Sequence, residues 1–262
     1  MRIVPARNGW LWLKQGWALF RRHPAEWILL MLFFMLSSGA INWIPAIGPY
    51  LASILIPGFS VGLMLACAGA EGGHAPHPRV LIVSFRHSGK PLLTLGVLYL
   101  LGMMLTLVAS SAVDDGALMQ QMLSGTPPPE PALKDGSYAA AMGLTGLLAT
   151  PMLMAFWFSP LLVSWRALGV GQALFYSFFA SLRNWRGFFL YGLILFAGLM
   201  VASLTIAMLG VAAGAGVAAM RGAMLGLAIV MMPAVTCSFY YSYQDIFPPD
   251  NPDTQNTPEA QD

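Results

Sequence analysis

The sequence predicts an all-α membrane protein, a polytopic bundle of six transmembrane helices with additional amphipathic helices at the membrane surface. Three observations predict this fold class. Apolar residues make up 57% of the 262 residues and charged residues only 9%, whereas about a quarter of the residues of soluble domains are charged. Apolar stretches long enough to span a bilayer recur along the chain. Lys and Arg are concentrated in alternate loops between those stretches.

The predicted crossings follow from the requirement for about 20 apolar residues in each transmembrane helix. The last two crossings share one apolar stretch, in which Arg221 and the Gly- and Ala-rich residues 210–220 are expected to form the turn. Residues 1–247 should therefore form one membrane domain, and the acidic residues 248–262, which have little apolar surface to bury, a disordered tail. The six crossings are expected at 25–43, 50–70, 91–112, 139–164, 188–209 and 222–243.

The distribution of basic residues predicts the orientation of these crossings. Eleven of the thirteen Lys and Arg residues lie before the first crossing or in the loops 71–90 and 165–187, and only Lys134 and Arg221 lie on the opposite side. Because Lys and Arg favour the cytoplasmic side, both termini are predicted to be cytoplasmic, and the acidic loop 113–137 to face outward. The first crossing lacks a convincing cleavage site and is expected to be an uncleaved anchor. The basic residues form no stripe, so nucleic-acid binding is not expected.

A repeated unit is visible in the order of these segments. An amphipathic stretch that ends in an apolar–Arg pair precedes each odd-numbered crossing, at Phe20-Arg21, Phe85-Arg86 and Leu182-Arg183. Each pair is followed by a hairpin whose second helix contains proline. This order predicts a three-fold repeat of one unit, made of a surface helix, a crossing and a kinked crossing.

The amphipathic segments are the candidate membrane-interface sites, because they combine aromatic and basic side chains. On a helical wheel of the first segment, the aromatic and Leu side chains are assigned to one broad arc and the cations to another. The lipid bilayer is thus the expected partner, with anionic lipids at the cytoplasmic face. Packing of these helices onto the bundle explains the same pattern equally well. The predicted interface residues are Trp10, Trp12, Trp17, Arg21, Arg22, Arg183, Trp185 and Arg186.

Prolines within the crossings are the candidate kink or cavity-lining positions, since a proline inside a helix leaves a backbone carbonyl without its usual partner. A transporter would use such breaks to surround a substrate, whereas a structural bundle would simply be kinked. Kinks are favoured, because little polarity converges on these positions and no Asp, Glu, Lys or His lies in the middle of a predicted crossing. The four prolines are Pro57, Pro151, Pro160 and Pro233.

The sequence contains no catalytic, metal or cofactor motif that would indicate an enzyme. His74 and His77, with His87 nearby, are the best metal candidates, but no carboxylate or Cys is suitably spaced, and a solvated loop is the simpler interpretation. Cys67 and Cys237 lie inside apolar stretches and are interpreted as core residues.

Glycines spaced four residues apart, at 210 and 214 and again at 222 and 226, favour close packing of helices. Packing within the chain is the expected use of this spacing. A dimer interface, and hence a homo-oligomer, is the alternative.

Two short motifs carry a resemblance to a known family. They are Arg183-Asn184-Trp185, followed by Phe189-Leu190 and Gly192-Leu193, and the closing Ser242-Tyr243-Gln244-Asp245-Ile246-Phe247. Together with the six crossings they resemble an uncharacterised family of proteobacterial inner-membrane proteins. The repeat unit is also similar to membrane domains attached to some glycerophosphodiesterases, although no phosphodiesterase domain is present. The resemblance implies a multi-pass protein of the bacterial inner (cytoplasmic) membrane and supplies no cofactor and no functional residues.

The sequence as a whole therefore predicts a non-enzymatic structural or accessory component of the cell envelope. The alternative is a permease for an apolar or weakly polar small solute, which would use the proline-broken helices.

Overall fold

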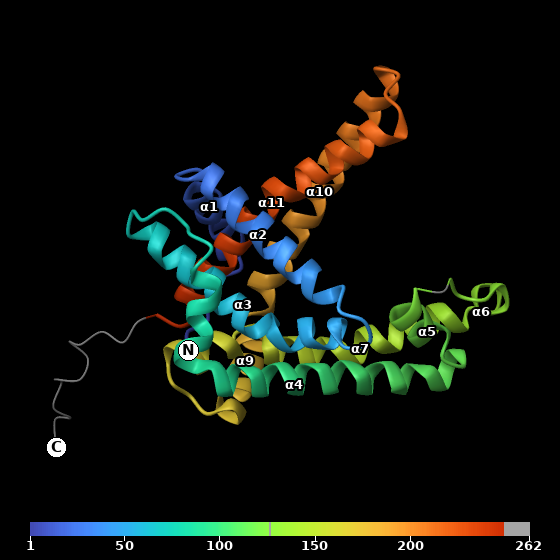
Figure 1. The fold of residues 1–262 in the computed structure, drawn as a ribbon, viewed down its shortest axis with the longest axis horizontal. Coiled ribbons are helices and arrows are strands. Elements are labelled where there is room, and N and C mark those ends of the chain that lie inside the picture. Colours follow the sequence, from blue (N-terminus) through green and yellow to red (C-terminus); the bar gives the residue numbers. More distant parts are fainter. Residues whose placement is uncertain (126, 249–262) are drawn as a thin grey trace. The chain divides into compact units, whose positions relative to one another are not determined.

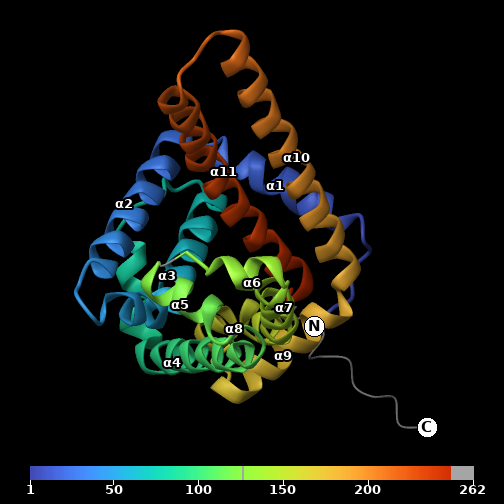
Figure 2. The ribbon, with the colours of Figure 1, turned by 90° about the vertical axis from the view of Figure 1, so that its right-hand side faces the viewer.

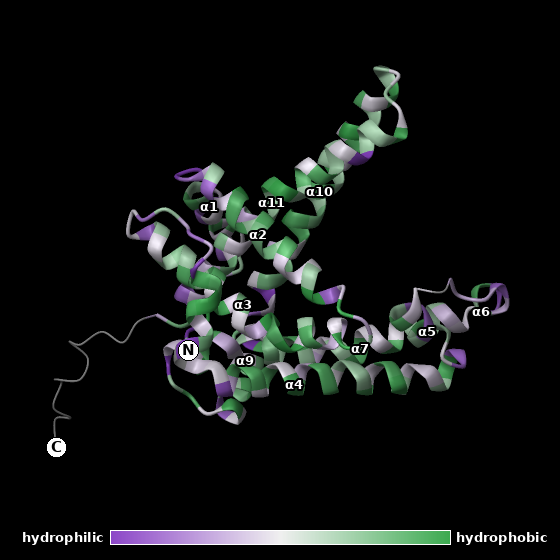
Figure 3. Ribbon diagram, in the orientation of Figure 1, coloured by the Kyte–Doolittle hydropathy of each residue, from purple (hydrophilic) through white to green (hydrophobic). Residues whose placement is uncertain are grey.

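The computed structural model describes residues 1–125 and 127–248, and regular secondary structure in that part of the chain is α-helical. The predicted tail, 248–262, lies outside the described residues except for Pro248. Helix α10 (Trp185–Ala212) and most of α4 (Val80–Asp114) are hydrophobic along their length (Figure 3). Within the described residues six helical segments are long and apolar enough to cross a membrane, which confirms the predicted fold class. They are α2 (Pro24–Asn42), α3 (Gly48–Glu71), Ser88–Asp114 of α4 (Val80–Asp114), α7 (Ser137–Trp157) with α8 (Ser159–Trp165), α10 (Trp185–Ala212) and α11 (Val217–Ile246).

The turn of the last hairpin is shorter than the sequence predicted. Helix α10 continues to Ala212 and α11 begins at Val217, so the turn comprises residues 213–216, and Arg221 lies inside α11. Alanine and methionine are strong helix formers, which explains why both helices extend into the patch that was expected to be the turn. Gly214 supplies the reversal with a φ of 64°, a conformation that glycine adopts without steric strain.

A short helical segment precedes each odd-numbered crossing, in the order that the repeat predicts. Helix α1 (Asn8–Phe20) precedes α2, and α9 (Val170–Arg183) precedes α10. Between them, the first two turns of α4 are separated from its crossing by a kink at Ser88, where φ is −132°. Pro91, which the sequence analysis did not single out, lies three residues after this kink inside α4, as expected for a proline that disrupts the preceding turn.

The chain folds as two compact units. The terminal unit contains the described residues of Met1–Ile28, Cys67–Ala75 and Arg183 onward, and the central unit contains Leu29–Ala66 and Pro76–Leu182. In the terminal unit, α1 packs against α11 and α10 (Figure 2). The buried side of α1 consists of Gly9, Trp12, Gly16, Leu19 and Phe20.

Two glycines allow α1 to approach the backbones of its neighbours. A Cβ atom on Gly9 would lie 2.4 Å from the carbonyl oxygen of Gly187 in α10. A Cβ atom on Gly16 would lie 2.4 Å from the backbone nitrogen of Ser238 in α11. Neither backbone can move aside as a flexible side chain could, so a larger residue at either position would push the helices apart.

In the central unit, α4 and α7 run side by side, with α5 (Ala117–Ser124) and α6 (Glu130–Lys134) packed at one end of the pair (Figure 1). Leu107, Leu118 and Ala141 are buried together at this end. The Asp114 carboxylate accepts hydrogen bonds from the backbone N–H groups of Gly116 and Leu118, at 3.0 and 2.7 Å. Asp114 therefore satisfies donors at the start of α5, as a capping residue does.

The break between α7 and α8 has an identifiable cause. Ser177 of α9 donates its hydroxyl to the carbonyl of Met154 and accepts the N–H of Phe158, both at 2.8 Å. The hydroxyl thus stands in place of the backbone bond between those two residues, and an inserted side chain is a known source of sharp kinks. Pro160 follows in the first turn of α8, where a missing N–H breaks no bond. Pro160 therefore starts a helix, whereas Pro57, Pro151 and Pro233 lie inside α3, α7 and α11.

Candidate functional site

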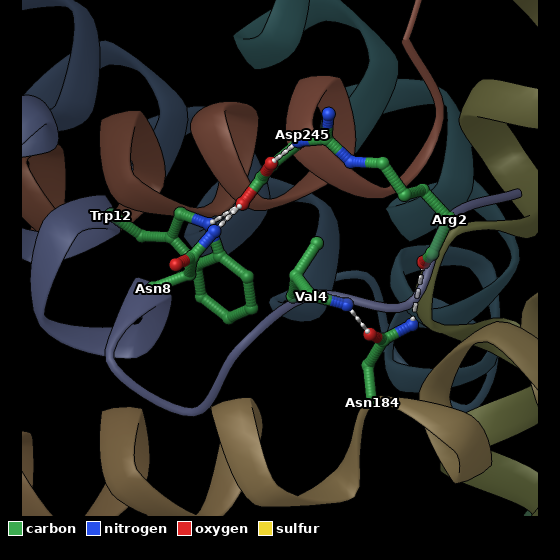
Figure 4. Close-up of polar contacts among 6 residues, drawn as sticks. All are labelled: Arg2, Val4, Asn8, Trp12, Asn184 and Asp245. Atoms are coloured by element: carbon green, nitrogen blue, oxygen red, sulfur yellow. Dashed lines mark hydrogen bonds and ion pairs between the residues drawn. The ribbon is translucent and has the colours of Figure 1, made fainter.

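A polar cluster around Asp245 occupies the end of α11 (Figure 4). The Asp245 side chain is 17% exposed. Its Oδ2 atom accepts hydrogen bonds from Asn8 Nδ2 at 2.6 Å and from Trp12 Nε1 at 3.0 Å. Its Oδ1 atom forms an ion pair with the guanidinium of Arg2. A single carboxylate thus binds the N-terminal segment and the start of α1 to the end of α11, through charge-assisted bonds that are stronger than neutral ones.

Asn184 binds the same N-terminal segment through its backbone (Figure 4). It lies between α9 and α10 and is 1% exposed. Its Oδ1 atom accepts the N–H of Val4 at 2.8 Å, and its Nδ2 group donates to the carbonyl of Arg2 at 3.1 Å. The N–H of Arg2 in turn donates to the carbonyl of Ile246 at 2.8 Å. An amide side chain suits this position because it offers both a donor and an acceptor.

Trp12 joins the polar cluster to the packing of the helices. The side chain is 1% exposed, and its ring centroid lies 5.2 Å from that of Phe188 and 6.2 Å from that of Tyr191, both on α10. The Tyr191 hydroxyl forms a 2.7 Å hydrogen bond with Ser238 Oγ of α11. Because its N–H is satisfied by Asp245, the large apolar ring of Trp12 can be buried without leaving a polar atom unpaired.

A second polar cluster surrounds Glu71 at the end of α3. Glu71 Oε2 accepts hydrogen bonds from the Tyr240 hydroxyl at 2.7 Å and from Gln244 Nε2 at 3.0 Å. Arg22 donates to the Glu71 carbonyl oxygen at 3.4 Å. Tyr240 and Gln244 are four residues apart on α11 and therefore share one side of it. This cluster fixes the end of α3 to the same part of α11 that carries Asp245.

The two cysteines of the chain lie about one turn further along the same two helices. Cys67 and Cys237 are buried and form no disulfide with each other; the Cys67 thiol donates a weak hydrogen bond to the sulfur of Cys237 at 4.0 Å. Their burial agrees with the interpretation of both as small core residues.

The chemistry of the Asp245 cluster is that of an anchor. Both carboxylate oxygens accept hydrogen bonds from the chain's own N-terminal segment and from the start of α1. A hollow of about 320 Å³ lies beside the cluster and is lined by Asp245 itself and by its partners Arg2, Asn8 and Trp12, together with Leu11, Gln15, Tyr241 and Gln244. In the described part of the chain, no group of His, Cys, Asp and Glu side chains is placed to hold a metal ion. His77 Nδ1 accepts the N–H of Arg79 at 3.1 Å, which is a local turn contact.

The chain is 34% identical over 265 residues to a probable inner membrane protein of Burkholderia thailandensis. The similarity covers 99% of this chain and 98% of that protein. This chain belongs to the same family. Neither a family model nor a solved structure matches it. The relationship and the six membrane-capable helices together identify an integral, multi-pass inner-membrane protein.

Most of the predicted interface residues of this inner-membrane protein are exposed. Trp10 and Trp17 are 53% and 39% exposed, and the Arg186 guanidinium lies over the Trp185 ring, 5.6 Å from its centroid. Their contact with lipid stays a prediction. The exposed residues of this set are Trp10, Trp17, Arg21, Arg22, Arg183, Trp185 and Arg186.

Trp12 differs from the other predicted interface residues, because it is buried against α10 and bonded to Asp245. Two residues advance a helix by about 200°, so Trp10 and Trp12 point in nearly opposite directions. The prediction that both lie in one arc is wrong. The alternative prediction for this helix, that it packs onto the bundle, describes Trp12.

The predicted kink prolines do not all belong to one unit. Pro233 lies in the terminal unit, and the other three lie in the central unit. Hydroxyls near them bond back to their own helix: Ser60 donates to the carbonyl of Pro57 and Ser53 to that of Pro49, both at 2.8 Å. Such bonds need no ligand. A cavity-lining role for the prolines stays a prediction.

Sequence reasoning did not single out Asp245, Asn184 or Glu71 as site residues. Asp245 and Asn184 do belong to the two motifs that carry the family resemblance, and this was the available signal. Their partners are 180 to 243 positions distant in the sequence. Hydrophobic periodicity reports only on neighbours within a few turns, so it could not have paired them.

Proposed function

We propose that this inner-membrane protein is a non-enzymatic structural or accessory component of the envelope, with both termini in the cytoplasm and anionic lipids around its cytoplasmic surface. The observation that carries the proposal is the Asp245 cluster. Sites that act on a substrate keep polar groups available to it, whereas here the carboxylate is used to hold the chain's own N-terminal segment. The exposed basic residues near the helix ends support the proposed orientation, because anionic lipid attracts them.

An accessory role also agrees with the similarity of the repeat unit to membrane domains attached to glycerophosphodiesterases. Such domains accompany a separate catalytic domain. In the proposed accessory role, the membrane unit contributes to the organisation of the membrane, and other proteins carry out the chemistry.

A permease for an apolar or weakly polar solute is the second candidate, and one feature of the central unit favours it. A hollow of about 610 Å³ lies between the α2–α3 turn, α4 and α5, within the range of small-molecule sites. Its lining is mainly apolar, with the polar groups of Asn42, Tyr50, Ser53 and Tyr99 among them. That composition suits a solute with few polar groups.

Efflux from proteoliposomes that contain the full-length protein separates the two candidates. The liposomes are loaded with neutral fluorescent solutes of graded polarity, and a Ser53→Trp variant, which fills the central hollow, is the matched control. The structural proposal predicts the same efflux from wild-type, variant and protein-free liposomes. Efflux that requires the wild-type protein and is lost in Ser53→Trp would contradict the structural proposal and support the permease.

The structural role also predicts a positive result in cells. Cells without the protein should become more sensitive to detergent. The Ser53→Trp variant should restore resistance, because it leaves the anchor intact, and Asp245→Ala should not. Rescue by Asp245→Ala as complete as that by the wild type would contradict the importance of the anchor.

A further inference from the structure

Helix α1 has two flanks of opposite character, each beside a hollow. Asn8, Leu11, Trp12 and Gln15 follow the spacing i, i+3, i+4, i+7 and line the polar hollow beside Asp245. The same spacing recurs two residues later, at residues 10, 13, 14 and 17, and these side chains line a second hollow of about 280 Å³. Because this spacing keeps side chains on one side of a helix, α1 separates a polar hollow from an apolar one.

The walls of the second hollow, which we name the α1 groove, come from α1 and from the membrane-spanning helices α10 and α11. They are Trp10, Leu13, Lys14 and Trp17 of α1, Leu195 of α10, and Met231, Ala234 and Val235 of α11. Val235 lies ten residues before Asp245, which is about 15 Å along the helix. The groove is thus displaced from the polar end of α11 toward its apolar interior. In a bilayer, such a groove is filled by acyl chains, because water is absent at that depth.

Charge and aromatic residues at the groove indicate which lipid fills it. Lys14 is exposed and is the charged residue among the eight that line the groove. No carboxylate within the described residues forms an ion pair with it. A Lys side chain can lie along apolar surface while its ammonium reaches the headgroup level. Trp10 and Trp17 flank Lys14 and are of the residue type enriched at that level.

We propose that the α1 groove binds an anionic phospholipid. One acyl chain lies against Leu195, Met231 and Val235, and the phosphate pairs with the ammonium of Lys14. A zwitterionic headgroup is disfavoured, since its own cationic group already offsets the charge of the phosphate with which Lys14 would pair. The proposal rests on the proposed membrane role and deepens it by naming a site for the anionic lipid.

Native mass spectrometry tests the proposal with the full-length protein in nanodiscs that contain phosphatidylglycerol and phosphatidylcholine in equal amounts. The wild-type protein should retain phosphatidylglycerol preferentially. Lys14→Gln should lower this preference roughly fivefold, the effect of one basic residue near an anionic membrane surface. Lys90→Gln is the matched control, because Lys90 is also exposed and predicted to be cytoplasmic but lies in the central unit; it should leave the preference unchanged.

Val235→Phe fills the groove and should reduce the retention of both lipids. An unaltered preference in Lys14→Gln, or an equal loss in Lys90→Gln, would overturn the proposal, since general surface charge would then explain the binding. A lipid-free dimer would overturn it as well, because a second copy would then cover the groove.

Tryptophan fluorescence provides a second measurement that does not depend on Val235→Phe folding. Phosphatidylglycerol with brominated chains should quench the protein more than brominated phosphatidylcholine does. This excess should fall in Trp17→Phe, with Trp10 still lining the groove, and should persist unchanged in Trp43→Phe, which removes an exposed tryptophan outside the groove. The opposite pattern would refute the site. The lipid measurements are independent of solute efflux, so a permease with this lipid site, or a structural protein without it, would each be recognised.

Discussion

Replacing Asp245 with Asn tests whether one carboxylate anchors the N-terminal segment. The substitution keeps the shape of the side chain and removes its charge. Two bonds are strongly affected, those from Asn8 and Trp12, because both donors approach a carboxylate oxygen in a setting that is only 17% exposed. The ion pair with Arg2 matters less, since the Arg2 side chain is 60% exposed and exposed pairs contribute about 0–1 kcal/mol.

These contacts give the expected magnitude. A hydrogen bond to a charged group stabilises a fold by about 1.5–3 kcal/mol and a neutral one by about 0.5–1.5 kcal/mol, so each of the two bonds loses about 1 kcal/mol. With the discounted ion pair, opening of the N-terminal segment together with the start of α1, which carries Asn8 and Trp12, should become easier by about 2–3 kcal/mol. Opening of a terminal segment need not unfold the protein. A change of this size corresponds to a roughly 30- to 150-fold increase in the population of the open form.

Hydrogen exchange of the Val4 amide, measured on the full-length protein in nanodiscs, is the assay. This N–H is bound by Asn184 and not by Asp245, so it reports opening of the segment and not loss of its own partner. Asp245→Asn should accelerate its exchange by the factor above. Arg2→Ala should accelerate it less than about fivefold, because it removes only the exposed pair.

Glu130→Gln is the control for removal of a carboxylate in general. Glu130 pairs with Lys134 at 2.8 Å, and both side chains are more than three-quarters exposed, so Val4 exchange should not change. An exchange rate within twofold of the wild type in Asp245→Asn would refute the reasoning. So would an effect of Arg2→Ala as large as that of Asp245→Asn, since the exposed ion pair and not the two part-buried bonds would then hold the segment.

Three further predictions concern packing, capping and orientation. Gly16→Ala should lower the free energy of unfolding by about 1–3 kcal/mol in thermal unfolding, because its methyl group would meet the backbone of α11. Gly39→Ala, with open space around the new methyl group, should be neutral or slightly stabilising. Equal effects of the two substitutions would contradict the close approach of α1. Asp114→Ala should make α5 more susceptible to limited proteolysis, since loss of a cap costs about 0.5–2 kcal/mol; unchanged cleavage would show that packing alone holds α5. Alkaline phosphatase fused after residue 125 should be active and after residue 80 inactive, and the reverse result would overturn the predicted orientation.

The number and approximate limits of the membrane-spanning helices could be predicted from the sequence, because bilayer thickness sets the length of an apolar helix regardless of what packs around it. The predicted crossing at 188–209, for example, lies inside α10. The limits of the last turn were wrong, because the high helix propensity of the Ala-rich residues extended both helices to a four-residue turn. The break before α8 could be placed near Pro160, but its cause, the hydroxyl of Ser177, comes from a different helix.

The sequence by itself thus determined the fold class, the exposed character of Trp10 and Trp17 and the amphipathic nature of α1, since each follows from local spacing and from the solvent. Only the tertiary structure decided which side of α1 is buried and what it meets. Gly9 and Gly16 are ordinary small residues in the sequence and become sites of close approach only beside the backbones of α10 and α11. Asp245 and Arg2 are 243 positions apart in the sequence, and they pair because the helices between them bring the two segments together. Such contacts arise from the packing of distant segments, which local periodicity cannot predict.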